Sequence, residues 1–499
     1  WLPGCLAAWL PGCLAAWLSG CLAAVLLYCL APFRPHSIAI LLLSYRSPRG
    51  RTIETRHCRM VPDFRMILEI ILSAEGFDAP KAVAKKLNRL WEMCKSVMSK
   101  APAYDWGMRS LKSVSKVAGG LKRASPQEHE DQIISNAAGS IYHARILPVD
   151  AQTFVSLLRT TFAGAQVDLA AGETEWTERI AEAMRSRERD CALECTSAFV
   201  RKCRQLSDAL NTRHSVMLLG PAGSGKTVCR TLVGTARERL MSDDPCVRLP
   251  LHSHTIDPKA CTPNELYGYI AVKGGEWHDG VLSWCFRTMN HKEGEGERWL
   301  VLDGDVDANW VESLNTVMDD NKVLTLASNE RIALHSDARL LFESDSLAYT
   351  SPATVSRMGI VAMSADEVGW LARLRSCLSV TSAPAADRGV DDELNASRLF
   401  KAGDRLGAML MELIERIVSP TFAAMRTWQG LSTHAEILLA ETIARVLDAL
   451  LTSTTLKTSE LVSAPPARAR TFLEACVQFA TIWGALGLPS EASADAASK

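Results

Sequence analysis

The sequence has almost no excess of charge of either sign. Its 55 lysine and arginine residues are balanced by 56 aspartate and glutamate residues, so the net charge is −1 over 499 residues. A general nucleic-acid binder usually carries a strong basic excess, and the balance argues against that class. With 47% apolar residues, the composition is ordinary for a soluble chain, and its length suggests about three domains.

Cysteine is also too scarce to form a disulfide scaffold. The chain has 15 cysteines, and no two of them form a CxxC pair. Cys191 and Cys195 are four residues apart and could share a helix face, so a metal site there is the alternative to free thiols. We expect reduced thiols and a reducing, cytosolic compartment.

The start of the chain lacks a methionine and the basic segment that a signal peptide requires. Residues 1–24 instead consist of an eight-residue unit in three copies, WLPGCLAA, WLPGCLAA and WLSGCLAA. Eight residues overshoot two helical turns by about 80°, so the repeat gives no constant helix face. We interpret this part as low-complexity sequence. A membrane segment is the alternative, because the run is apolar.

The rest of the chain changes its periodicity twice. Apolar residues at helical spacing predict a small helical domain, followed by a polar loop and further helices. Short apolar runs that alternate with helical stretches then predict an α/β domain with a parallel core sheet. Helical spacing returns from about residue 366. The predicted helices are 61–74, 81–100, 104–121 and much of 150–212, the loop is 124–132, the strands are 215–219, 247–251, 299–302 and 339–342, and a hairpin joins 323–326 to 332–334.

Residues 220–227, GPAGSGKT, match the phosphate-binding pattern G-x-x-x-x-G-K-[ST] in full. An apolar strand precedes the motif and a helix follows it, so backbone N–H groups and the helix N-terminus can surround phosphates. We predict that Lys226 reaches the β- and γ-phosphates of ATP and that the Thr227 hydroxyl binds Mg²⁺. The predicted nucleotide-binding residues of this loop are Gly220, Pro221, Ala222, Gly223, Ser224, Gly225, Lys226 and Thr227.

A second motif, Trp-Leu-Val-Leu-Asp, ends in Asp303. An acid at the end of a buried strand is typical of the second Mg²⁺ ligand of P-loop ATPases, opposite Thr227. ATPases of the AAA+ kind usually carry glutamate next, to orient the attacking water, but this chain has Gly304. Asp305 would face the other way in a strand. We therefore predict that the site holds ATP and hydrolyses it slowly.

Arg357 is the third candidate residue. We expect it in a loop after the last strand of the sheet, where ring ATPases present an arginine finger to the γ-phosphate of a neighbouring subunit. A surface arginine in a solvated loop is the alternative.

Several longer motifs together resemble dynein heavy chains, and the axonemal type more than the cytoplasmic one. The match covers about residues 58–499. The motifs lie at 61–64, 74–77, 104–109, 118–123, 264–268, 275–280, 303–331, 351–359, 473–475 and 479–484.

The resemblance implies an α/β AAA+ P-loop fold with a five-stranded parallel core sheet, flanked by helical domains. In that family six AAA+ modules form the ring of a microtubule motor, and the second module binds ATP without evident hydrolysis. The implied domains are an unassigned segment 1–57, a small helical domain of the first module 58–125, a helical linker 126–212, the nucleotide-binding domain of the second module 213–365 and a helical domain with extension 366–499.

The resemblance also assigns roles outside the phosphate loop. Arg357 becomes the finger toward the nucleotide of the first module, and Arg109 becomes the second sensor of that same nucleotide. Glu343 falls where an active module has a polar sensor, and Asn329 belongs to the preceding hairpin. Implied partners are the other modules, microtubules and dynein intermediate and light chains. The expected location is the cytoplasm and cytoskeleton, in the axoneme of a cilium or flagellum, without nucleic acid or membrane.

Two other hypotheses stay open. The chain could be an independent, oligomeric AAA+ ATPase that remodels proteins, although Gly304 argues against that activity. It could also be a degenerate gene copy, which the repeat at 1–24 and the lack of a phosphate loop before residue 58 favour.

Overall fold

The computed structural model describes residues 38–46, 52–60, 63–165, 173–185, 196–240, 250–271, 275–291, 296–379, 405–429, 433–453 and 464–486. The chain divides into two compact units, Trp1–Ile67 and Leu68–Lys499. In the first unit, β1 (Ile38–Arg46) and β2 (Thr52–Met60) form an antiparallel pair that the sequence did not predict. The repeat at 1–24 and the pair Cys191 and Cys195 lie outside the described residues.

Most helices before the sheet follow the predicted apolar spacing with small shifts, but the helix at Glu130–Arg145 was not predicted. The helices are α2 (Phe64–Ala74), α3 (Pro80–Val97), α4 (Met108–Ala124), α5 (Glu130–Arg145), α6 (Pro148–Thr161), α7 (Glu173–Arg185) and α8 (Ser197–Thr212). Helix α5 starts inside the stretch interpreted as a polar loop, because the His129 side chain accepts a hydrogen bond from the backbone N–H of Asp131 and caps the helix. Helix α8 is capped in the same way by Thr196.

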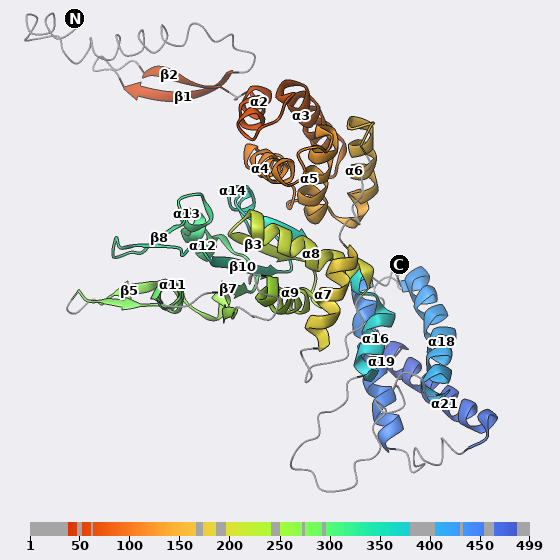
Figure 1. The fold of residues 1–499 in the computed structure, drawn as a ribbon. Coiled ribbons are helices and arrows are strands. Elements are labelled where there is room, and N and C mark those ends of the chain that lie inside the picture. The colour runs from red at the N-terminus through yellow and green to blue at the C-terminus, as the bar shows by residue number, and fades with distance from the viewer. Residues whose placement is uncertain are drawn as a thin grey trace, which may run out of the picture. The chain divides into compact units, whose positions relative to one another are not determined.

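The sheet has five strands, as the resemblance implied, in the order β11-β3-β10-β7-β4. All four neighbouring pairs are parallel. The strands are β3 (Ser215–Leu219), β4 (His252–Ile256), β7 (Arg298–Asp303), β10 (Ala338–Ser344) and β11 (Gly359–Ala362). Figure 1 shows these strands with α8 and α9 (Lys226–Leu240) beside them.

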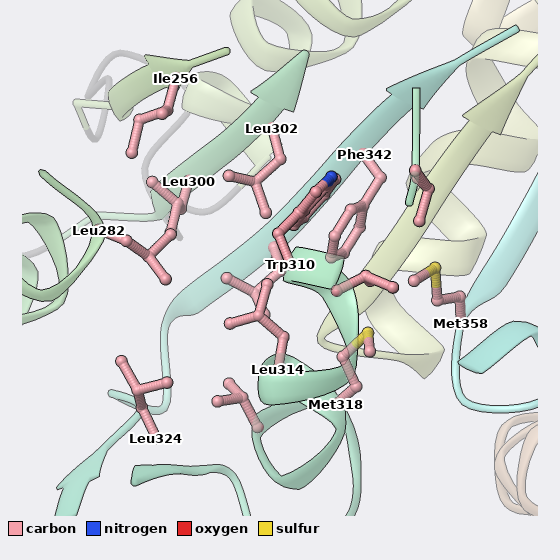
Figure 2. Packing of buried hydrophobic residues seen from close by; sticks show 14 of the residues in the cluster. Ile256, Leu282, Leu300, Leu302, Trp310, Leu314, Met318, Leu324, Phe342 and Met358 are labelled. Atoms are coloured by element: carbon pink, nitrogen blue, oxygen red, sulfur yellow. The ribbon is translucent and has the colours of Figure 1, made fainter. Parts of the chain in front are cut away.

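Alternate residues of β3, β7, β10 and β11 enter two separate cores, as the two-residue period of a strand requires. On one face, Val216, Leu218 and Trp299 pack with side chains of α7, α8 and α9. On the other face, Phe342 and Trp310 stack with ring centroids 6.3 Å apart. Figure 2 shows this second core between the strands and the short helices that follow β7.

Short elements connect the strands of the sheet. They are α10 (Pro263–Tyr267), the antiparallel pair β5 (Gly268–Ile270) and β6 (Trp277–Asp279), α11 (Val281–His291), α12 (Ala308–Val311), α13 (Asn315–Met318), and the pair β8 (Val323–Thr325) and β9 (Arg331–Ala333). The pair β8 and β9 confirms the predicted hairpin. Asn329 lies in its turn with φ 64°, a left-handed conformation that asparagine tolerates.

The predictions for the edges of the sheet differ from the structure. The strand expected at 247–251 lies mostly outside the described residues, and the strand that pairs with β7 at this edge is β4 at His252–Ile256. The edge strand β11 was missed, and it follows Arg357. Arg357 therefore lies before the last strand of the sheet, between α14 (Pro352–Val355) and β11, and not after it.

After the sheet, helices form a core of their own. They are α15 (Ala365–Val368), α16 (Trp370–Ser379), α18 (Arg405–Gln429), α19 (Thr433–Ser453) and α21 (Pro466–Thr481), followed by a π-helical turn at Ile482–Leu486. In the part of the chain that the structure describes, no helix is both long enough and apolar enough to cross a membrane.

Candidate functional site

The predicted phosphate loop runs from the end of β3 to the first residue of α9, as a P-loop requires. Two of its glycines are required by their surroundings. A Cβ at Gly220 would lie 2.2 Å from the backbone oxygen of Met363. Gly225 has φ +83°, and a Cβ there would lie 2.8 Å from the ring of Phe199. Only glycine lets the backbone take this course.

A pocket of about 640 Å³ opens at this loop. Charged residues from the carboxyl ends of β7 and β10 line one part of it. Helices α8, α15 and α19 supply apolar residues to another part, and polar residues of α16 and α19 lie beside them. The lining residues include Phe199, Lys226, Thr227, Asp257, Lys259, Asp303, Gly304, Asp305, Glu343, Asp345, Val368, Arg373, Ile437, Leu438 and Glu441.

Lys226 is fixed at the mouth of the loop by oxygen atoms. Its Nζ donates to the backbone oxygen of Gly220 at 2.6 Å and lies 2.5 Å from Oδ1 of Asp345. The ammonium group thus occupies a position where phosphate oxygens can replace its present partners. Asp345 follows β10 and forms no motif with the loop, so it could not be predicted from the sequence.

Thr227 contacts Glu343 in the structure. Its Oγ1 donates to Oε2 of Glu343 at 2.6 Å, and Arg230 of α9 pairs with the other carboxylate oxygen. Glu343 is 1% exposed and lies opposite Asp303 in the register of β10 and β7. The two acids and the threonine therefore meet at the ends of neighbouring strands and the start of α9. Sequence reasoning placed Glu343 near the nucleotide but did not foresee its pairing with Arg230.

Asp303 lies in crowded negative surroundings. Partial burial raises the pKa of its carboxyl group, and the neighbouring Glu343 carboxylate raises it further. A divalent cation would relieve this crowding, and hydroxyl and carboxylate oxygens are the ligands that Mg²⁺ prefers. Across the described ranges, no group of three or more His, Cys, Asp or Glu side chains is arranged to hold a metal ion. The donor set fits a Mg²⁺ ion that nucleotide phosphates and water would complete.

Asp303 is followed by Gly304 and Asp305, so the position next to it has no glutamate side chain that could reach the pocket. Gly304 has φ +153°, and its N–H donates to the backbone oxygen of Glu343 at 3.1 Å. Asp305 was expected to face away from the site, but β7 ends at Asp303, so strand alternation does not apply. Asp305 lines the pocket and pairs with Lys259 at 2.9 Å, which lowers the pKa of its carboxyl group.

Arg109 and Arg357 line a different pocket, of about 720 Å³. The two arginines share one acid: Asp319 Oδ1 lies 3.0 Å from Arg109 Nη2, and Asp319 Oδ2 lies 2.9 Å from Arg357 Nε. Lys112, Lys116 and Arg213 add three more cations to the wall, against the acids Asp105 and Asp320. Sequence reasoning missed Asp319, which no motif connects to either arginine.

The two pockets lie at opposite ends of β3. Arg213 and His214, which precede the strand, line the second pocket, and Gly225 and Lys226, which follow it, line the first. A five-residue strand is about 17 Å long. The structure therefore brings Arg109 and Arg357 together, far from Lys226.

Comparisons with known proteins match both parts of the chain. A family model described as the hydrolytic ATP binding site of the dynein motor region matches residues 53–227. A second model, the AAA domain of the dynein-related subfamily, matches residues 215–358. The first match ends at Thr227, so it covers the helices before the sheet and the phosphate loop.

Individual relatives agree with these models. The chain is 41% identical over 316 residues to the ciliary dynein beta chain of Tripneustes gratilla, a match that covers 63% of this chain and 7% of that protein. It is 36% identical over 430 residues to human dynein axonemal heavy chain 17, covering 86% of this chain and 9% of that protein. It is 39% identical over 312 residues to the flagellar outer arm dynein beta chain of Chlamydomonas reinhardtii, covering 62% and 7%.

The chain belongs to the dynein heavy chain family. It represents a part of the motor region that contains AAA modules, and its relatives are of the axonemal type. The chain spans less than a tenth of the length of these dynein heavy chains. The α/β fold with a phosphate loop at the end of β3 is the fold that the dynein resemblance implied.

Proposed function

We propose that this part of a dynein heavy chain holds Mg-ATP at residues 220–227 and hydrolyses it slowly. The observation that carries the proposal is which functional groups line one wall of the pocket. Lys226 and Thr227 face Asp303, and the next residue is Gly304 instead of a carboxylate. The site has the groups that bind phosphate and a cation and lacks the group that orients an attacking water molecule.

Mg²⁺ would be held by Thr227 and Asp303, with Glu343 close by. In the structure, the Thr227 hydroxyl donates its proton to Glu343, so the lone pairs of its oxygen are available to a cation while this hydrogen bond is kept. The cation would neutralise phosphate charge beside the acids that line the pocket. Lys226 would exchange Asp345 for phosphate oxygens in the same step.

The family model that matches residues 53–227 is described as a hydrolytic ATP binding site, and slow turnover does not conflict with that match. That match ends before Asp303 and Gly304, which lie in the second match. Of the other acids near Gly304, Asp305 is paired with Lys259, and Asp257 Oδ1 accepts the backbone N–H of Lys259. Neither carboxylate is free to take the role of the absent glutamate without giving up a partner.

Lys226→Ala tests the binding site. Removing the ammonium group takes away the counter-charge of the phosphates, and we expect the affinity for labelled ATP to fall at least about 100-fold, because hydrogen bonds to charged groups contribute ~1.5–3 kcal/mol each. Lys259→Ala is the matched control, since Lys259 lines the same pocket but pairs with Asp305. Equal ATP binding by parent and Lys226→Ala would refute the assignment.

Turnover is measured separately, by steady-state phosphate release from the purified chain. We expect a rate far below the ~1–10³ s⁻¹ typical of enzymes. A rate near one per second that disappears in Lys226→Ala would instead favour an independent AAA+ ATPase.

We further propose that Arg109 and Arg357 serve a nucleotide of the preceding module of the ring. Their shared pocket lies at the end of β3 opposite the phosphate loop and contains more cations than acids among its lining residues. In the complete motor this pocket would face the preceding module's γ-phosphate. The larger context would be a microtubule motor with intermediate and light chains, in the axoneme of a cilium or flagellum, as the ciliary and flagellar relatives suggest.

A further inference from the structure

The segment that carries Arg357 is held by arginines from the preceding part of the chain. Arg213 Nη1 donates to the backbone oxygen of Arg357 at 3.0 Å and lies 3.4 Å from that of Ser356. Arg145 Nη2, on buried α5, donates to the backbone oxygen of Met358 at 2.9 Å. Three successive carbonyl groups therefore accept from two guanidinium groups, and this short segment has a fixed backbone.

The second Nη atom of Arg213 binds to α4, the helix that carries Arg109. Arg213 Nη2 donates to the backbone oxygen of Arg109 at 3.2 Å and to Oγ of Ser113 at 2.9 Å, both on α4. One planar guanidinium group thus joins the backbone of Arg109 to the backbone of Arg357. A lysine ammonium has no such fork and cannot reproduce these directions.

The side chains of the pair are fixed as well. Asp319 contacts both guanidinium groups, and Arg109 Nη1 donates to Oγ of Ser356 at 3.0 Å. Arg357 Nη1 donates to the backbone oxygen of Ala353 at 2.8 Å. The side chain of Arg109 is 47% exposed and that of Arg357 is 18% exposed. Their guanidinium groups are therefore held by partners and are still accessible to a ligand in the pocket.

We propose that Arg213 is a positioning residue, which holds Arg109 and Arg357 at a fixed spacing for the terminal phosphate of a nucleoside triphosphate, with Asp319 aligning their side chains. This inference rests on the proposed function of the pair. Arg213 directly precedes β3, whose other end is the phosphate loop, so the same strand fixes both pockets. Preorganised cations stabilise developing phosphate charge without rearrangement during the reaction. A misplacement of about 1 Å can reduce a rate about 100-fold.

The test is made in the full-length heavy chain that contains this region, with Arg213→Lys. We expect the kcat of ATP hydrolysis to fall about 10- to 100-fold while KM changes less than about twofold, because the pair acts on the transition state. Arg339→Lys is the matched control. Arg339 also donates to backbone oxygens, those of Leu210, Ser336 and Ala338, but it contacts neither Arg109 nor Arg357.

Thermal midpoints of the two variants separate positioning from folding. If Arg213→Lys does not fold, Asp319→Asn takes its place, because the Asp319 side chain is 27% exposed and contacts the guanidinium groups of both arginines. An unchanged kcat in Arg213→Lys, or in Asp319→Asn where that variant is used, refutes the positioning role, provided that Arg357→Ala lowers kcat. If Arg357→Ala and Arg109→Ala both leave kcat unchanged, the proposed function of the pair is wrong instead.

Discussion

Introducing a glutamate by Gly304→Glu is a direct test of the proposal that this site hydrolyses ATP slowly. A well-placed general base contributes roughly 10²–10⁴ in rate, so a missing side chain alone would predict a large gain. The structure predicts no such gain. Gly304 has φ +153°, and a Cβ there would lie 3.0 Å from Oδ1 of Asp257.

The expected cost has two parts. A side chain at this φ adds about 1–3 kcal/mol of backbone strain. Asp257 must also give way by a few tenths of an ångström, which weakens the hydrogen bond that its Oδ1 accepts from the N–H of Lys259 at 3.0 Å and costs up to about 1 kcal/mol. At roughly 2–4 °C per kcal/mol for a domain of this size, the thermal midpoint should fall by about 5–15 °C.

Phosphate release and thermal unfolding are measured together on parent, Gly304→Glu and Gly304→Ala. The alanine variant carries the strain without the charge, so it should lose stability to a similar extent with unchanged turnover. Combining Gly304→Glu with Asp257→Ala removes the blocking carboxylate and should recover part of the stability. A turnover at least 100-fold above the parent, in Gly304→Glu alone and with an unchanged midpoint, would refute the reasoning.

Two further predictions concern stability. Glu297→Ala should lower the free energy of unfolding by about 3–5 kcal/mol in chemical denaturation, because it strands Arg237 as a buried charge; the two side chains are each 4% exposed and form two contacts at 2.6 and 2.9 Å. Arg179→Ala, which removes a surface pair with Glu175, is the control and should cost under about 0.5 kcal/mol, and equal losses would contradict the burial argument. Burial, and then nearby lysine and arginine charges, lower the pKa of His143 to about 4. Between about pH 6.5 and 4, the unfolded chain therefore binds a proton that the folded chain does not. The free energy of unfolding should decrease by up to ~3 kcal/mol as the pH is lowered across that window. In His143→Gln that part of the pH dependence should be absent, and an identical pH profile would show that the group is not neutral in the fold.

The phosphate site could be read from the sequence because its determinants are local. Residues 220–227 are contiguous, and the turn that they form depends on glycines, on the apolar strand before them and on the helix after them. Asp303 was found in the same way, as an acid that ends a run of apolar residues. The hairpin of β8 and β9 was also predicted, since its two strands and its turn are neighbours in the chain.

Short strands at the edges of the sheet were not predictable on this basis. The four residues of β11 and the polar alternation of β4 give almost no signal alone, and both become strands because β3 and β7 offer them a partner. Both β4 and β11 were missed for one reason, which is that edge strands depend on tertiary pairing more than on local propensity.

The pairs that decide the chemistry of both pockets come from distant parts of the chain. Thr227 and Glu343 are 116 residues apart, and Arg109 and Asp319 are 210 residues apart. A sequence pattern can identify each of these residues as polar, but it cannot measure the distance between them. The order of strands in the parallel sheet sets that distance, because it brings the ends of β3, β7 and β10 together at one edge and the starts of the same strands together at the other. The sequence by itself therefore determined the phosphate-loop motif at residues 220–227 and the strand and helix on either side of it. Only the tertiary structure decided which acids surround that loop and which residues hold the two arginines of the second pocket, because these contacts join residues that are far apart in the chain.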